Sequence, residues 1–81
     1  MFSKILTEND FILQDDGHYV ATILGTTHKL KGRLIVDKMY AAGSGGYNEN
    51  VIFSFSYDGL THDINICVDV PGTYRVVLNK V

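Results

Sequence analysis

The residues that could bind a metal ion or act as a nucleophile are few and widely spaced along the 81-residue chain. It contains three histidines, His18, His28 and His62, and a single cysteine, Cys67. No pair among them has the spacing of a zinc site, such as two histidines four residues apart on one helix. We therefore expect no metal and no other cofactor. His62 falls on the apolar face of a predicted hairpin, where a histidine is more often a structural residue with a satisfied ring nitrogen than a ligand.

The acids and Cys67 also lack the partners that catalysis requires. A cysteine nucleophile needs a base beside it, and the sequence places none near Cys67. Asp63 and Asp69 share one face of a predicted strand, about 20 Å apart, too far for paired-carboxylate chemistry. Gly-Ser-Gly-Gly at residues 43–46 lacks the Lys-Ser/Thr and the helix of a phosphate-binding loop. We expect no enzymatic activity and no catalytic residue.

The side chains best suited to binding a partner are basic. Lys29, Lys31 and Arg33 alternate along a predicted strand, so they share one face within about 14 Å. Cations and aromatic rings on a strand face are how small β-barrels hold single-stranded nucleic acid. Lysines on an exposed edge strand also protect it from aggregation, and the net charge of −2 gives no overall attraction to nucleic acid.

The segment from Ala41 to Asn50 is the only low-complexity part of the chain. Its glycines at 43, 45 and 46 predict a flexible loop. Its composition, an amphipathic tyrosine among small polar residues, is typical of an antibody binding loop. Together with the basic residues, this gives the following predicted partner-binding set: Lys29, Lys31, Arg33, Tyr40, Tyr47 and Asn48.

β-Strands must position these residues, and the clearest pattern runs from Val51 to Val70. Two alternating apolar runs there flank Asp58-Gly59. Asp-Gly is a strong signal for a two-residue hairpin loop, because both residues tolerate positive φ. This loop would place Phe53 opposite Ile64, with the apolar side chains on one face.

A second Asp-Gly, at residues 16 and 17, predicts another hairpin, with Leu13 opposite Val20. From His28 to Tyr40 the alternation predicts one long strand that bends at Gly32. Residues 1–10 fit either a short helical turn or a first strand lying on the core.

The chain changes direction at Pro71-Gly72, which fits a type II turn. A tight hairpin there would set core positions opposite polar ones, so we expect the chain to cross into another sheet, with Tyr74, Val76 and Leu78 facing inward. The run around Tyr74 is typical of Greek-key corners, where a tyrosine hydroxyl bonds back to the backbone.

These patterns predict a single all-β domain over residues 1–81. We expect a small antiparallel β-sandwich or partly open barrel of about six strands built from hairpins, with room for a short N-terminal helical turn. No run approaches 18 apolar residues, and a lone cysteine suits a reducing compartment, so we expect a soluble cytoplasmic protein without membrane contact. A homodimer would cover exposed sheet edges.

For function, we expect a non-catalytic protein-binding module, of the kind that phages and mobile elements use as small inhibitors of a host enzyme or defence complex. One alternative is a small β-barrel that binds single-stranded nucleic acid through the basic strand face. Another is a small-molecule binder, such as a sponge for a nucleotide signal, that uses the backbone amides of the Gly-rich loop. The net charge of −2 favours a protein partner over nucleic acid.

Overall fold

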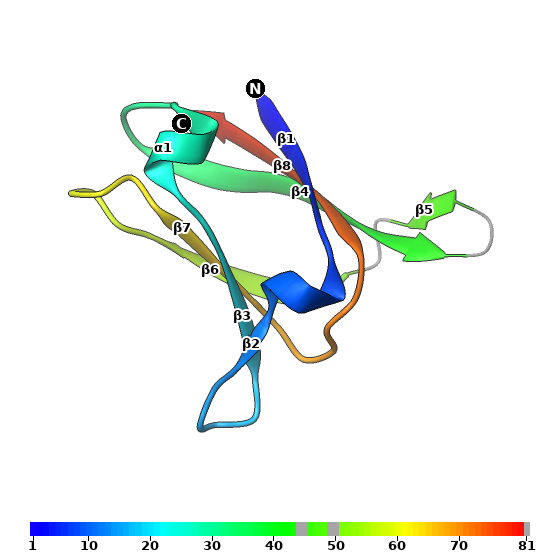
Figure 1. The fold of residues 1–81 in the computed structure, drawn as a ribbon. Helices are drawn as coiled ribbons and strands as arrows, with labels where there is room; N and C mark the ends of the chain where they lie inside the picture. The colour runs from blue at the N-terminus through cyan, green and yellow to red at the C-terminus, as the bar shows by residue number, and fades with distance from the viewer. Residues whose placement is uncertain (44–45, 49–50, 81) are drawn as a thin grey trace.

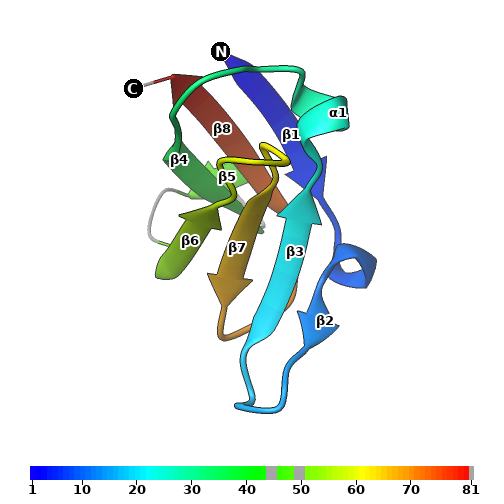
Figure 2. The same ribbon diagram turned by 90° about the vertical axis from the view of Figure 1, so that its left-hand side faces the viewer.

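The structure is a computed structural model, and it describes residues 1–43, 46–48 and 51–80. In these residues, two antiparallel sheets of four strands each pack face to face as a sandwich (Figure 1 and Figure 2). The all-β prediction is confirmed, and the described strands number eight where about six were expected. None of the described helices is long and apolar enough to cross a membrane.

The first sheet has the order β1-β8-β4-β5 and the second the order β2-β3-β7-β6. The strands of the first sheet are β1 (Phe2–Leu6), β4 (Leu34–Gly43), β5 (Gly46–Asn48) and β8 (Tyr74–Lys80). Those of the second are β2 (Ile12–Leu13), β3 (Tyr19–Ile23), β6 (Phe53–Tyr57) and β7 (Ile64–Val68). A 3-10 turn, η1 (Glu8–Asp10), and one turn of α-helix, α1 (Gly25–His28), lie on connections between the sheets.

The N-terminal segment forms both of the elements that its pattern allowed, one after the other. Phe2 to Leu6 pairs with β8 along its whole length, which supplies backbone hydrogen bonds that a short isolated helix could not sustain. The helical turn follows as η1, where the Asp10 carboxylate accepts a hydrogen bond from the Thr7 amide at 2.8 Å.

The hairpin of β6 and β7 has the predicted faces but a different register. Phe53 lies opposite Val68, where a two-residue loop would have set it opposite Ile64. The connection is longer, because the Asp58 amide donates to the Asp63 carbonyl at 2.9 Å and closes residues 58–63 into a loop. A shift of four residues is even, so the apolar side chains stay on the inner face.

The hairpin of β2 and β3 differs from the prediction by one residue. Leu13 lies opposite Tyr19 rather than Val20. The Gly17 amide donates to the Gln14 carbonyl, and Gly17 has a φ of +87°, so the loop contains three residues and a left-handed glycine. This odd shift changes which residues of the two strands share a face, so Leu13 shares its face with Tyr19 and not with Val20.

The long strand predicted over residues 28–40 is wrong in its first half. Lys29 and Gly32 have φ values of +57° and +95°, which an extended strand excludes, and β4 begins only at Leu34. A bulge between Val36 and Lys38 then reverses the alternation. Met39 is therefore buried, with 2% of its surface exposed, although the sequence pattern placed it outward.

The Gly-rich segment is not the predicted loop at the positions that the structure describes. Ala41–Gly43 completes β4, and Gly46–Asn48 forms β5, which pairs with it in antiparallel register. Ser44, Gly45, Glu49 and Asn50 lie outside the described residues. Short backbone pairing therefore replaces most of the expected loop.

The crossing at Pro71 is confirmed, because β7 and β8 belong to different sheets. Tyr74, Val76 and Leu78 are buried as predicted. The Tyr74 hydroxyl donates to the Val70 carbonyl, as the local sequence pattern predicted. Burial raises the pKa of the Tyr74 phenol above its ordinary value.

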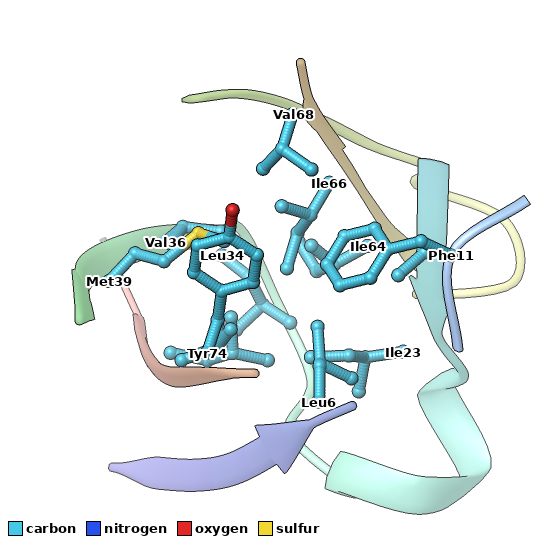
Figure 3. Packing of buried hydrophobic residues seen from close by; sticks show 13 residues of the cluster. Leu6, Phe11, Ile23, Leu34, Val36, Met39, Ile64, Ile66, Val68 and Tyr74 are labelled. Carbon is cyan, nitrogen blue, oxygen red and sulfur yellow. The ribbon is translucent and has the colours of Figure 1, made fainter. Parts of the chain in front are cut away.

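The core lies between the sheets and takes side chains from both of them (Figure 3). Ile64 and Ile66 of β7 face Val76 and Leu78 of the opposite sheet, and all four are fully buried. Phe11 meets Tyr74 edge to face, with ring centroids 5.5 Å apart. Because each buried aliphatic side chain contributes roughly 1.5–3 kcal/mol, this cluster is the main source of stability.

Candidate protein-binding surface

The predicted basic residues lie on the connection between α1 and β4. Lys29, Lys31 and Arg33 are all exposed, but they precede the strand and do not share a strand face. Within the described parts of the chain, none of the three side chains forms an ion pair or hydrogen bond. Three cations within five residues are thus free to bind an external partner.

The other predicted binding residues lie far from these cations. Tyr40 is half-buried on the outer face of β4, where the Arg75 guanidinium lies 5.9 Å from the centre of its ring. Tyr47 and Asn48 belong to β5, and their side chains lie outside what the structure describes. At about 3.3 Å per residue, the run of β4 separates Arg33 from the β5 pairing by roughly 25–30 Å. The predicted set is therefore not one site.

The connection that carries the cations is tied to the turn between β6 and β7. The Gly25 amide donates to the Asp63 carboxylate at 2.8 Å, which joins residues 38 positions apart. The Tyr57 hydroxyl donates to the Gly32 carbonyl. Figure 2 shows this connection and the turn at the same end of the sandwich. Their relative position is therefore fixed by tertiary contacts.

Two histidines complete this polar network. The buried His28 accepts the Leu30 amide hydrogen at Nδ1, at 2.9 Å, so its Nε2 carries the hydrogen and donates it to the His62 carbonyl. Since the Tyr57 hydroxyl gives its single hydrogen to Gly32, the hydrogen of the 2.6 Å contact comes from Nδ1 of His62. Both rings have structural partners, as predicted for His62.

The tip of the turn exposes an apolar residue that the sequence did not reveal. Leu60 is 92% exposed, and its amide donates to the Asp58 carboxylate at 2.8 Å, which holds the tip in place. The predicted two-residue loop would have set Leu60 opposite Tyr57, inside the sheet. Its only sequence signal is an apolar residue directly after Asp-Gly. We name this surface, formed by Lys29, Lys31, Arg33 and Leu60, the basic end.

A shallow depression on the outer face of the second sheet gathers residue types used in catalysis. Its volume is about 380 Å³, and its lining includes Cys67, His18, Asp16 and Asp69. His18 directs Nδ1 to Asp16 at 3.3 Å and Nε2 to Asp69 at 3.1 Å. Because both ring nitrogens face carboxylates, neither is directed at the Cys67 sulfur as a base would be.

No group of three or more possible metal ligands occurs in residues 1–43, 46–48 and 51–80. Hydrogen bonds instead hold the backbone of the basic end, through the Gly25 amide and the Gly32 carbonyl. The chain matches no protein-family model, no curated protein sequence and no solved structure.

Proposed function

We propose that this protein is a non-catalytic protein-binding module that docks through the basic end onto an acidic surface of its partner. One observation carries the proposal. At one end of the sandwich, three exposed cations that form no ion pair within the described residues lie on a connection that is hydrogen-bonded to the β6–β7 hairpin, and the turn of that hairpin carries Leu60, an apolar residue that is 92% exposed. An apolar anchor with a charged rim is the usual composition of a protein interface.

The fixed backbone of the basic end supports this proposal energetically. Binding orders side chains and loops, and that cost falls when the backbone already has its bound conformation. Here the Gly32 carbonyl and the Gly25 amide are both held by side chains of the β6–β7 hairpin. The exposed cations would add electrostatic attraction, which raises association rates most strongly at low salt.

A small inhibitor from a phage or mobile element, acting on a host enzyme or defence complex, is the kind of protein that we propose. Such a protein needs a compact scaffold and one docking surface, without chemistry of its own. We place it in the cytoplasm, because its only cysteine, Cys67, leaves no internal disulfide to form. The partner we expect is an acidic protein surface.

Single-stranded nucleic acid is the competing partner, although the mechanism predicted for it has lost its basis. That mechanism needed Lys29, Lys31 and Arg33 on a strand face beside aromatic rings, and they lie on a connection instead. A nucleotide signal held by the Gly-rich segment remains a prediction, since residues 44–45 and 49–50 lie outside the described chain.

The proposal is tested by affinity capture from host lysate with the wild type and three variants. We expect a protein to be captured at a fixed stoichiometry and to be lost with Lys31→Glu and with Leu60→Asp. Lys4→Glu makes the same change in net charge on β1 and should retain it. Equal capture by all four proteins would contradict the proposal. Captured material that nuclease removes would assign the basic end to nucleic acid instead.

A further inference from the structure

The edges of the two sheets differ in how they are protected against pairing with another strand. In the first sheet, β1 carries the exposed Lys4 opposite the buried Val76, and β4 has a bulge in its pairing with β8, beside the exposed Lys38. Among the described strands, β2 has only two residues and β5 only three. Charges, bulges and short length are the usual devices that keep a sheet edge from pairing.

β6 has none of these devices. It pairs with β7 on one side, and no described strand pairs with it on the other. Its five residues, Phe-Ser-Phe-Ser-Tyr, include no charge, no proline and no bulge. Phe55 remains 39% exposed, and Ile52, just before the strand, is 90% exposed. The edge is therefore open and partly apolar.

The sequence of β6 reads the same in both directions by residue type. Aromatic residues occupy positions 53, 55 and 57, and serines occupy 54 and 56. An antiparallel pair of two such strands centred on Phe55 sets ring against ring and hydroxyl against hydroxyl along its whole length. Cross-strand aromatic pairs and serine pairs are both favourable. Few other strands would match it this completely.

We propose that the open edge of β6 pairs with β6 of a second copy of this chain, around a two-fold axis through Phe55. The two second sheets then join into one continuous sheet of eight strands. In this register Ser54 lies opposite Ser56 of the partner subunit, and Phe53 lies opposite the partner's Tyr57. Such an interface is closed, because the same surface is used on both copies. It leaves Leu60 and the cations of the basic end outside the pairing.

The register makes a specific test possible with exposed residues alone. Ser54 and Ser56 both face solvent, so substitutions there need not disturb the core. In S54K/S56K, each lysine would face a lysine of the other copy, whereas in S54K/S56E each would face a glutamate. Ser3→Lys adds one exposed charge to an edge strand of the other sheet, β1, and serves as the control.

The measurement is sedimentation equilibrium over a concentration series from about 1 to 500 µM, a range in which one short strand pair can associate. We expect wild type, Ser3→Lys and S54K/S56E to dimerise, and S54K/S56K to weaken dimerisation at least about tenfold. Circular dichroism checks that each variant is folded. A wild type that stays monomeric, dimerisation unchanged in S54K/S56K, or dimerisation lost equally in both double variants would overturn the proposal. Failure here leaves capture at the basic end unaffected, so the two proposals fail separately.

Discussion

The dipeptide Asp-Gly occurs twice in this chain, and its two copies form different turns. At residues 16 and 17 it closes a three-residue loop in which Gly17 adopts the left-handed conformation, with a φ of +87°. At residues 58 and 59 it opens a longer turn in which the left-handed residue is His62, with a φ of +64°. The same dipeptide therefore places its glycine in a left-handed conformation in the first turn but not in the second.

The difference comes from what lies next to each turn. The first projects into solvent, and its Asp16 carboxylate accepts one backbone hydrogen bond, from His18 at 3.0 Å. The second lies against α1, where Gly25 approaches the turn closely. Contacts made by distant residues can select a turn type that the dipeptide alone does not favour.

The largest effect is expected from Gly25→Ala. A Cβ at this position would lie 2.2 Å from the Thr61 carbonyl oxygen, which is backbone and cannot move aside cheaply. We expect the free energy of unfolding to fall by about 3 kcal/mol, the upper end of the usual cost of overpacking. Urea denaturation measures it. Stability equal to that of the wild type would show that the second turn does not depend on close contact with α1.

Removing the Tyr57 hydroxyl should loosen the second turn without creating a cavity in the core. Tyr57→Phe removes the hydrogen bonds to Gly32 and His62, each worth about 1 kcal/mol, and leaves the His62 ring nitrogen without its acceptor. We expect a loss of roughly 1–2 kcal/mol and faster amide hydrogen exchange in the residues of the turn. Tyr74→Phe is the matched control, since it removes one hydroxyl bond at the other end of the sandwich.

The two glycines should respond differently to alanine. Gly17→Ala places a side chain at a left-handed position, so we expect a loss of about 1 kcal/mol. Gly59→Ala meets no atom within 4 Å and has no left-handed φ, so its change should stay within about 0.5 kcal/mol. Thermal unfolding of both variants gives the comparison. Equal losses would mean that both glycines serve the same turn geometry.

The smallest effect is expected in acid. Backbone hydrogen bonds from Leu60 and Thr61 lower the pKa of Asp58 from its ordinary 3.8, and the amide of His18 does the same for Asp16. A carboxyl group whose pKa is lower in the folded state stabilises the fold above about pH 4, and that contribution is lost as the pH falls through the folded-state pKa.

Substitution separates the two carboxylates. Asp58→Asn should reduce the acid sensitivity of the unfolding free energy more than Asp16→Asn, because Asp58 accepts from two backbone amides and Asp16 from one. Denaturant titrations at several values between about pH 5 and pH 2 measure this slope. A larger reduction of the acid sensitivity in Asp16→Asn than in Asp58→Asn would contradict this expectation.

Local chemistry predicted some features well. The face of Ile64 and Ile66 was correct despite the wrong register, because an even shift preserves alternation. The crossing at Pro71 and the Tyr74 hydroxyl bond depend on residues close together in the sequence. The bulge after Val36 was not predicted, and Gly25-Thr26-Thr27 predicts a turn but not its helical form, because sheet pairing and distant contacts determine these features.

The candidate surface was predicted only in its composition. Lys29, Lys31 and Arg33 are exposed as expected, but the positive φ of Lys29 and Gly32 removes them from a strand. Leu60 was assigned to the sheet because a two-residue loop was assumed. An exposed apolar tip becomes visible only after the length of the turn is known, and the structure shows a turn that closes between Asp58 and Asp63.

Tyr57 joins the two proposed binding surfaces, the open edge of β6 and the basic end. It is the last residue of β6, the strand with the open edge, and its hydroxyl binds Gly32 in the connection that carries the cations. A strand added along β6 would restrain the Tyr57 backbone, and a partner on the connection would restrain the acceptor of its hydroxyl. Thermodynamic linkage requires that any coupling transmitted through Tyr57 acts equally in both directions. A partner that tightens self-pairing at β6 would then be bound more tightly, by the same factor, by the self-paired form.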